Sequence, residues 1–259
     1  MIVTTTRKGA DVLEGRAQLI TLELEGQFVP RKDVSIEEMI SFYKDDVLVI
    51  GKGKTSLYSK QGGDPFFYHP NSAMFRVKQY QKTNYDPLVA AADLSTGMSF
   101  LDCTLGLASD SLVAQLAVGE TGHVTGLEAN QILAWIVRTG LQSWQDGSSL
   151  MINSMRRIEV IHAHHSDYLP KLAENSYDVV YFDPMFEQHI SSSTGIRALK
   201  QFACHDDLSD HVIEEALRIA RSRVVLKDHY ASERFERFGF QVIKRQHAAF
   251  HYGNIEIKK

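Results

Sequence analysis

The stretch FQVIKRQHAAFHYGNIEI, residues 240 to 257, contains two runs of β-branched and aromatic residues near the carboxyl end of the chain. Such runs are typical of β-strands. Only a few residues after Arg245 separate the two runs, so no helix fits between them. A connection this short joins strands that run in opposite directions. The stretch therefore predicts an antiparallel hairpin at the edge of a sheet.

Five further candidate strands precede the hairpin and alternate with stretches of helical character. They are SFLDCT (99–104), HVTGLE (123–128), IEVIHA (158–163), DVVYFD (178–183) and RVVLKD (223–228). This alternation predicts right-handed βαβ units and a doubly wound, mostly parallel sheet with helices on both faces. A dinucleotide-binding Rossmann domain normally continues with parallel units. A seven-stranded sheet that ends in an antiparallel hairpin instead resembles the methyltransferase variant of this α/β fold, here over residues 81–259.

Residues 1–80 predict a small N-terminal α/β domain. The expected elements are a strand in IVTTT (2–6), a helix over residues 10–25, and two strands around the Gly-Lys-Gly turn of DVLVIGKGKTSLYS (46–59). Another helix is expected to begin at Ser35, because Glu38 then occupies the third helical position of a capping box. The loop QGGDPFFYHPN (61–71), which follows, is a candidate lid over the next domain.

The composition limits the class of protein. With 259 residues, 44% of them hydrophobic, the chain has the length and composition of an ordinary globular protein. Its first residues lack a signal peptide's apolar core, and no run approaches the roughly 20 apolar residues that span a bilayer. We therefore expect a cytoplasmic protein in which Cys103 and Cys204 are reduced thiols. A net charge of −4 argues against coating of nucleic acid by global charge, although local basic clusters can still bind phosphates.

Polar residues follow the strand at 99–104, where a doubly wound sheet binds its ligand. Asp102 ends this strand, and Gly106 permits a tight turn. Ser109 and Asp110 begin the next helix. A dinucleotide fingerprint uses three glycines to admit a pyrophosphate, whereas only Gly106 is present here. Because carboxylates repel a pyrophosphate and attract a cation, the loop favours S-adenosylmethionine, with its sulfonium and ammonium groups, over NAD.

The next two strands also end in polar residues. Glu128, followed by Ala129, lies 22 residues after Gly106 (106 to 128), where an acidic residue accepts the ribose hydroxyls of an adenosine. His164 and His165 follow the third strand, where an adenine edge would be bound. Neighbouring strand residues point to opposite faces, and no further Cys or His completes a set at ligand spacing. Contacts with the cofactor are therefore favoured for these histidines, and no metal is predicted.

The stretch DVVYFDPMF (178–186) contains the fourth strand, which is expected beside the first. Proline holds the preceding residue extended, so the carboxylate of Asp183 and the carbonyl oxygen of Pro184 can both face a substrate. Two such acceptors would orient an exocyclic amine, whose lone pair is delocalised into its ring. Phe186 would stack on the base, a contact of about 1 to 3 kcal/mol. Taken alone, the stretch favours a strand that ends in a turn with Phe186 in the core.

The sequence also resembles a known family. Residues 183–186, DPMF, are similar to the D/N-P-P-Y/F/W motif of amino-group methyltransferases acting on nucleic acids, with Met185 in place of the second proline. In order along the chain, DCTLGLASD, LEA, IHAHHSD, YFDPMF and VVLKDH resemble the RsmJ family of 16S rRNA guanine-N2 methyltransferases, in which DPMF itself occurs. The resemblance covers most of residues 66–259.

This resemblance implies a set of contacts with S-adenosylmethionine. They would lie at Ser109, Asp110, Glu128, Ala129, His164, His165 and Asp183. The chain also departs from the family pattern. His164 and His165 replace small hydroxyl residues, Ala129 replaces an arginine, and Asp228 follows Lys227 where an arginine is usual. These departures are compatible with binding of the cofactor and bear mainly on the identity of the substrate.

We therefore predict a class I S-adenosylmethionine-dependent methyltransferase that acts on an exocyclic amine of RNA, and the resemblance implies guanine N2 of small-subunit rRNA. Asp183, Pro184 and Phe186 would act at the methyl acceptor. Substrate contacts are predicted at Met185, Phe186, Lys227, Arg76 and Lys78. Two alternatives remain open: a methyltransferase of a small molecule or a protein, and a non-catalytic nucleotide- or RNA-binding Rossmann-like module. A common face for the Asp183 loop and Arg76, Lys78, Lys82 and Arg156 would favour RNA over a small substrate.

Overall fold

The computed structural model describes residues 1–185, 198–204, 206–246 and 248–258. Spatial contacts divide the chain into two compact units. Residues 1–69 and 198–202 form the first unit, and the second unit contains residues 70–185 and the described residues from 203 onward. The division comes after His69 and not near residue 80, because the helix over residues 71–83 packs against a helix of the second unit.

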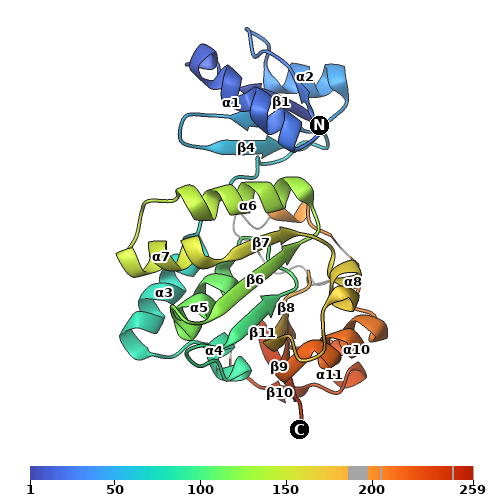
Figure 1. The fold of residues 1–259 in the computed structure, drawn as a ribbon. Helices are drawn as coiled ribbons and strands as arrows, with labels where there is room; N and C mark the ends of the chain where they lie inside the picture. Colours follow the sequence, from blue (N-terminus) through green and yellow to red (C-terminus); the bar gives the residue numbers. More distant parts are fainter. Residues whose placement is uncertain (186–197, 205, 247, 259) are drawn as a thin grey trace. The chain divides into compact units, whose positions relative to one another are not determined.

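The first unit contains a four-stranded sheet with the order β2-β1-β3-β4 (Figure 1). Its elements are β1 (Ile2–Thr5), α1 (Ala10–Glu23), β2 (Gln27–Phe28), α2 (Ile36–Tyr43), β3 (Val47–Ile50) and β4 (Thr55–Tyr58). Strand β1 is parallel to β2 and β3, whereas β3 and β4 form the antiparallel pair expected around the Gly-Lys-Gly turn. Strands β1 and β3 are buried along their whole length, so this unit has its own hydrophobic core.

Helix α2 begins with the capping box expected from the sequence. The Glu38 N–H donates to Ser35 Oγ at 3.1 Å, and the Ser35 N–H donates to Glu38 Oε2 at 2.7 Å. These two bonds satisfy N–H groups for which the first turn of a helix has no internal partner. The bonds from Ser35 also hold the pKa of the Glu38 carboxyl below its usual range. The predicted start of α2 is therefore confirmed.

The loop after β4 is attached to the sheet through Phe66. Its N–H and C=O groups exchange hydrogen bonds of 2.8 Å with the backbone of Leu57, and its side chain is 1% exposed. This part of the expected 61–71 loop thus contributes to the core of the first unit. Movement of the loop as a lid remains a prediction.

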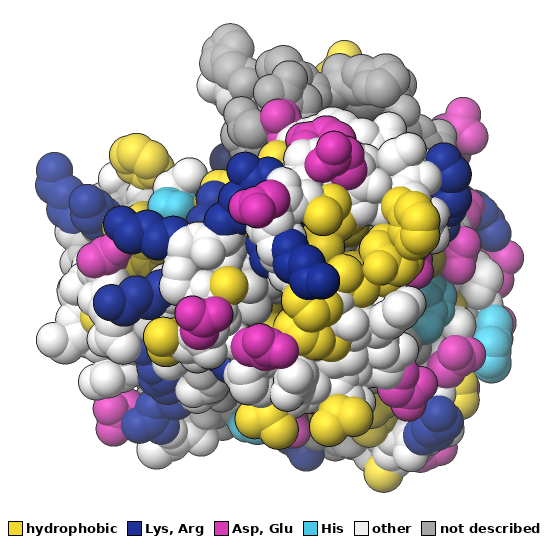
Figure 2. All heavy atoms as spheres, turned by 90° about the horizontal axis from the view of Figure 1, so that it is seen from above, with side chains coloured by type: hydrophobic (Ala, Val, Ile, Leu, Met, Phe, Trp, Pro, Cys, Tyr) yellow, Lys and Arg dark blue, Asp and Glu magenta, His cyan; other side chains and the backbone are white. Residues whose placement is uncertain are grey.

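Helix α1 presents apolar side chains to solvent. Val12, Leu19 and Leu22 are between 69% and 87% exposed. Figure 2 shows hydrophobic side chains gathered on one face of the molecule, with charged side chains around them. Helix α1 has only 14 residues, whereas a membrane-spanning helix needs about 20 predominantly apolar ones. Within the described ranges, no helix combines the length and the hydropathy needed to cross a bilayer.

The second unit contains a seven-stranded sheet with the order β10-β11-β9-β8-β5-β6-β7 (Figure 1). Its strands are β5 (Ser99–Asp102), β6 (His123–Glu128), β7 (Glu159–His162), β8 (Tyr177–Phe182), β9 (Ala220–His229), β10 (Gln241–Ile243) and β11 (Phe250–Glu256). Strands β5 to β9 are parallel, and β11 is antiparallel to both β9 and β10. The seven predicted strands and the antiparallel hairpin are therefore confirmed, with the last strand placed between β9 and β10.

Helices cover both faces of this sheet. They are α3 (Asn71–Thr83), α4 (Pro87–Ala92), α5 (Ser109–Val118), α6 (Gln131–Ser143), α7 (Ser149–Arg157), α8 (His165–Tyr168), the 3-10 turn η1 (Leu169–Lys171), α10 (Asp210–Ile219) and α11 (Arg234–Arg237). Helices α5 and α6 pack on β5, β6 and β7, and α10 packs on β8 and β9. In Figure 1, α3, α5 and α7 lie on one side of the strands, and α8, α10 and α11 lie on the other.

Strand β5 lies where the chain changes direction across the sheet. From β5 the chain proceeds to β6 and β7 on one side, whereas β8 and β9 follow on the other. The central strands are buried on both faces, which explains their continuous apolar runs. Ligands of such sheets bind beyond the carboxyl ends of the strands at this switch point. The loops after β5 and β8 are therefore the expected position of a functional site.

The capping box gives a test of the first unit. Ser35→Ala removes the side-chain acceptor at the N-cap and should lower the free energy of unfolding by about 1 kcal/mol. Ser41→Ala, at an exposed position inside α2, is the matched control and should change it by less than about 0.5 kcal/mol. Urea unfolding followed by circular dichroism measures both values. Equal effects of the two substitutions would contradict the role of the cap.

Candidate active site

A single lysine connects the loop after β8 with the start of α5. Lys227 Nζ donates to Asp183 Oδ2 at 2.5 Å and to Asp110 Oδ2 at 3.1 Å. The Lys227 side chain is 14% exposed, and Asp110 is buried while Asp183 is partly open to solvent. Lys227 lies on β9, two residues before the end of that strand at His229. The structure therefore brings together three residues that the sequence predicted for the site.

Arg76 holds Asp110 from the other side. Its guanidinium donates to Asp110 Oδ1 and makes two bonds of 2.9 Å to the carboxylate of Asp86. The Tyr181 hydroxyl also donates to Asp110, at 3.1 Å. Because a buried carboxylate needs partners of this kind, these contacts fix Asp110 within the protein. The donors of Arg76 are directed to these two carboxylates, so it positions Asp110, and a contact of Arg76 with the substrate stays a prediction.

Lys227 and the two aspartates that it contacts differ in their affinity for a proton. Burial alone would raise the pKa of Asp110, but Lys227 and Arg76 hold it below its usual range. Burial raises the pKa of Asp183 to about 6, assisted by the charge of Asp110 and opposed by Lys227. Burial would lower the pKa of Lys227, but the two aspartates hold it above its usual range. Lys227 is thus a fixed cation, and Asp183 is the member of the cluster that exchanges a proton near neutral pH.

The loop after β5 is a tight turn anchored by Asp102. Gly106 and Ala108 adopt φ angles of 50° and 59°, in the left-handed region. Asp102 accepts a hydrogen bond of 2.6 Å from the Ser111 hydroxyl and one of 3.1 Å from the Thr104 N–H. Its side chain is buried, and burial raises its pKa to about 7. The predicted turn and the polar start of α5 are present, and Asp102 joins them.

Thr104 links the two loops of the switch point. Its Oγ1 accepts a hydrogen bond of 2.6 Å from the Asp183 N–H. Sequence reasoning missed Thr104, because a threonine two residues after a strand carries no specific signal. Pro184 is buried and Met185 is partly buried. Phe186, predicted to stack on a base, lies outside the described residues.

Glu128 ends β6 beside the first loop. It accepts hydrogen bonds from the N–H groups of Asn130, at 2.9 Å, and of Gly106 and Ala129. The Glu128 side chain is 7% exposed, and burial raises its pKa to about 7 in spite of these bonds. Ala129 is partly buried next to it. The predicted acceptor for a ribose therefore lies directly against the Gly106 turn.

His164 and His165 do not lie in a strand. Strand β7 ends at His162, His164 is the N-cap of α8, and His165 is the first residue of that helix. Their ring centroids are 4.2 Å apart. The expectation that the two side chains point to opposite faces was wrong, because the chain leaves the sheet before it reaches them. Burial lowers the pKa of His165 to about 4, so this ring is neutral.

The four basic residues whose common face would favour RNA divide into two kinds. The guanidinium groups of the two arginines have partners within the protein: Arg156 donates to the carbonyl oxygens of Leu141 and Trp144 at the end of α6, and Arg76 pairs with Asp86 and Asp110. Lys78 and Lys82 are exposed and lie four residues apart on α3, which places them on one face of that helix. Of the four residues, only these two lysines are exposed.

Asp228 replaces an arginine of the family pattern and has a structural role. Its side chain is buried, accepts a 2.7 Å bond from the Ser232 hydroxyl, and pairs with Arg234 at 2.9 Å. These contacts hold the turn between β9 and α11. Asp228 therefore holds a loop, and the neighbouring Lys227 lies in the site.

The site fits a cationic nucleoside. Carboxylates whose pKa is raised by burial follow three adjacent strands, β5, β6 and β8, at Asp102, Glu128 and Asp183. A bound cation stabilises the charged form of such groups. The turn at Gly106 lacks the additional glycines of a pyrophosphate site. Fold and site together define a doubly wound enzyme domain of the class I methyltransferase type, with an adenosine-containing, positively charged cofactor.

Comparison with known families agrees with this class. Residues 59–245 match the family described as "Putative SAM-dependent methyltransferase", and the chain belongs to this family. It is an S-adenosylmethionine-dependent methyltransferase, and S-adenosylmethionine is its cofactor. A crystal structure of the SAM-dependent methyltransferase NGO1261 from Neisseria gonorrhoeae has the same fold, with a TM-score of 0.61 at 16% identity over 99% of this chain and 96% of the other.

Three relatives illustrate the range of similarity. The uncharacterized protein YpiP of Bacillus subtilis is 45% identical over 256 residues, which is 99% of each chain. Ribosomal RNA small subunit methyltransferase J from Desulfotalea psychrophila is 27% identical over 151 residues, or 56% of each chain. The enzyme of the same name from Pectobacterium atrosepticum is 30% identical over 130 residues, or 49% of this chain and 51% of the relative. The chain thus matches about half the length of the two named enzymes.

Burial of Asp102 makes a prediction about stability. Its pKa is about 7 in the folded chain, against about 3.9 in an unfolded chain, so the folded state holds the proton more tightly. The contribution of this group to the free energy of unfolding therefore falls as pH rises from about 4 to about 7. Asp102→Asn keeps the shape and removes this titration. The melting temperature of the variant minus that of wild type should therefore be higher at about pH 8 than at about pH 5. Thermal unfolding at the two pH values measures this difference.

Asp146→Asn, in an exposed loop, is the control for Asp102→Asn and should leave the pH dependence of the melting temperature unchanged. A difference between Asp102→Asn and wild type that stays constant with pH would contradict the assignment.

Proposed function

We propose that this enzyme methylates an exocyclic amine of RNA, namely guanine N2 in small-subunit rRNA. Support comes from the similarity to relatives named ribosomal RNA small subunit methyltransferase J. The observation that carries the proposal is the position of Asp183: a carboxylate with a pKa raised to about 6, at the end of β8 and beside the cofactor loops. An rRNA substrate would place the enzyme in the cytoplasm.

Asp183 and Pro184 would bind the amine through its two N–H groups. An exocyclic amine is a weak nucleophile, because its lone pair is delocalised into the ring. Two acceptors on its hydrogens orient that lone pair toward the methyl carbon. As the carbon–nitrogen bond forms, positive charge develops on nitrogen, and the Asp183 carboxylate can accept the proton that leaves. A pKa near the working pH suits Asp183 to this exchange.

Lys227 and Thr104 would hold Asp183 for this role. The lysine contacts the Asp183 carboxylate, and the threonine accepts from its backbone N–H at 2.6 Å. The amine must therefore displace or share the Lys227 contact at Asp183, while Asp110 retains the lysine at 3.1 Å. The permanent charge of Lys227 keeps Asp183 ionised over more of the pH range than burial alone would allow.

The cofactor would be held by the loops after β5, β6 and β7. S-adenosylmethionine supplies an electrophilic methyl group on a sulfonium, and transfer leaves a neutral thioether. Glu128 would accept the ribose hydroxyls, and Asp102 and Asp110 would set the negative potential that attracts the cation. His164 and His165 lie after β7, on the side expected for the adenine.

The role of Asp183 is tested by Asp183→Asn. The amide keeps the size of the side chain but takes up no proton, so methyl transfer to RNA should slow by about 100-fold or more. In wild type, the rate should fall as pH drops below about 6, because protonated Asp183 no longer accepts. Single-turnover transfer of labelled methyl groups to small ribosomal subunits or their naked RNA measures both effects.

The matched control for Asp183→Asn is Asp178→Asn, near the amino end of the same strand, where the carboxylate accepts from Ser99. This control should retain the wild-type rate and pH profile. Calorimetry with S-adenosylmethionine shows whether each variant remains folded and binds its cofactor. A wild-type rate for Asp183→Asn would remove Asp183 from the mechanism.

The exposed pair on α3 distinguishes RNA from a small substrate. Lys78 and Lys82 are solvent-facing, and lysines that contact phosphates release counterions on binding. Lys78→Glu combined with Lys82→Glu should weaken RNA binding and reduce the slope of log K against log salt by about 2. Lys171→Glu, an exposed lysine of η1, is the control. Unchanged RNA binding in the double variant would favour a small-molecule or protein substrate.

A further inference from the structure

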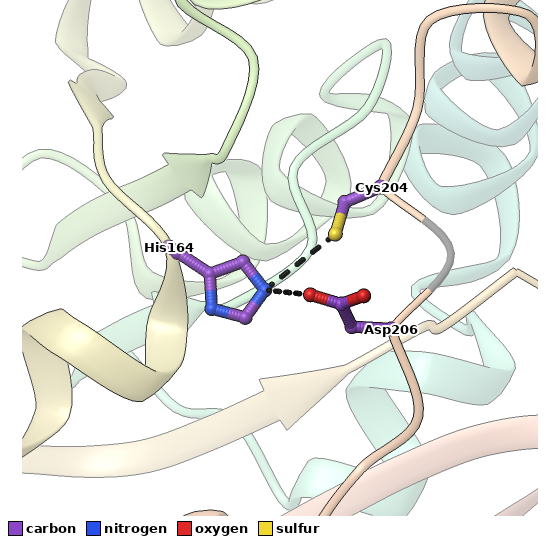
Figure 3. A group of neighbouring side chains, drawn as sticks. All are labelled: His164, Cys204 and Asp206. Atoms are coloured by element: carbon purple, nitrogen blue, oxygen red, sulfur yellow. Dashed lines mark hydrogen bonds and ion pairs between the residues drawn. The ribbon is translucent and has the colours of Figure 1, made fainter.

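Three metal-ligating side chains meet at the start of α8. They are His164, Cys204 and Asp206, and one ligand atom from each lies within 4.8 Å of the other two. His164 Nε2 is 3.6 Å from Cys204 Sγ and 3.6 Å from Asp206 Oδ2. Figure 3 shows the imidazole nitrogen directed toward both partners. His164 and Cys204 are 40 residues apart in the sequence, so the fold alone creates this group.

The two separations from His164 Nε2 match edges of a tetrahedral coordination shell. A zinc ion binds histidine nitrogen at about 2.0–2.1 Å, carboxylate oxygen at about 2.0–2.2 Å and thiolate sulfur at about 2.3 Å. Tetrahedral angles then separate the ligand atoms by about 3.3 to 3.6 Å. A direct N–H···O hydrogen bond would instead bring nitrogen and oxygen to about 2.9 Å. The 3.6 Å separation of His164 and Asp206 is therefore too long for a hydrogen bond and suitable for a shared ion.

We propose that His164, Cys204 and Asp206 bind a zinc ion through one nitrogen, one sulfur and one oxygen. This mixture of ligands suits borderline-soft Zn²⁺ and not the hard cations Mg²⁺ or Ca²⁺, which take oxygen ligands. The Cys204 thiol releases its proton to solvent when it binds the ion. Asp206 and Cys204 are exposed, so the ion can enter from solvent and a water can complete its coordination.

Neighbouring residues support His164 as a ligand. A metal-binding histidine usually donates its second ring N–H to an oxygen, which fixes the tautomer. His164 Nδ1 lies 2.7 Å from Ser166 Oγ, and the Ser166 hydroxyl donates to Asp167 Oδ1 at 3.3 Å. With the proton on Nδ1, this chain leaves the Nε2 lone pair facing Cys204 and Asp206. Once Nδ1 carries a proton, it no longer accepts the hydrogen bond of 3.3 Å from the Ser166 N–H.

The ion would join two segments of the second unit. His164 is fixed at the end of β7 by its position in α8, whereas Cys204 and Asp206 belong to the connection that leads to α10. His164 is itself a predicted contact of the cofactor, as is His165 beside it, so the zinc site adjoins the expected position of the adenine. The proposal rests on none of the residues of the Asp183 cluster, and metal binding can be measured without methyl transfer. The proposal therefore stands or fails separately from the proposed function.

Cobalt(II) titration of the reduced full-length chain tests the site. Cobalt occupies zinc sites, and a thiolate ligand gives it a charge-transfer band in the near ultraviolet. We expect one ion per chain with this band, and displacement of the cobalt by zinc. Cys204→Ser should abolish the band, and since Cys103 remains in that variant, the loss would assign the thiolate to Cys204. His164→Ala and Asp206→Ala should each weaken binding by about tenfold or more.

Two further variants complete the test. Ser166→Ala leaves all three ligands in place and should lower the affinity by about 10-fold to 100-fold, because it removes the oxygen that fixes the tautomer. His162→Ala, an exposed histidine at the end of β7, is the matched control and should bind cobalt as wild type does. Absence of the band in wild type, or its persistence in Cys204→Ser, would overturn the proposal. Circular dichroism verifies that each variant is folded.

Discussion

The contact of Lys227 with Asp110 and Asp183 is the interaction on which the rest of the site depends. A buried carboxylate and a partly buried one that share a partner would repel each other, and without the lysine one would take up a proton. The lysine between them, with Arg76 on the far side of Asp110, lets both remain charged. Through this network, helices α3 and α5 and strands β8 and β9 are fixed around the switch point. A buried cation thus determines where the loop after β8 can lie.

Burial of the acidic residues in the site disfavours their charged forms. Asp102 and Glu128 have their pKa values raised to about 7, although backbone and hydroxyl groups donate to both. A folded chain that keeps such carboxylates ionised loses stability relative to one with neutral residues there. The loss is offset when a cation binds nearby. A methyltransferase domain whose cofactor carries two positive groups therefore has a physical reason to retain them.

Local patterns made much of the fold predictable. The strands are short apolar runs between polar turns, the capping box of Ser35 and Glu38 lies within four residues, and the closing hairpin follows from the length of one connection. Each of these depends on neighbours in the sequence. The histidines after β7 show the limit, because the strand ends at His162, before His164 and His165, which were expected to continue it. Outside a strand, neighbouring side chains no longer alternate between two faces.

The sequence by itself determined the doubly wound sheet, its antiparallel end, and the acidic residues that follow three neighbouring strands. Only the tertiary structure decided what those residues contact. Lys227 and Asp110 are 117 residues apart, and Thr104 and Asp183 are 79 apart. It likewise paired Arg76 with Asp110, and brought Cys204 and Asp206 to His164. Contacts across such distances arise from packing of whole elements, and hydrophobic periodicity along the chain carries no information about them.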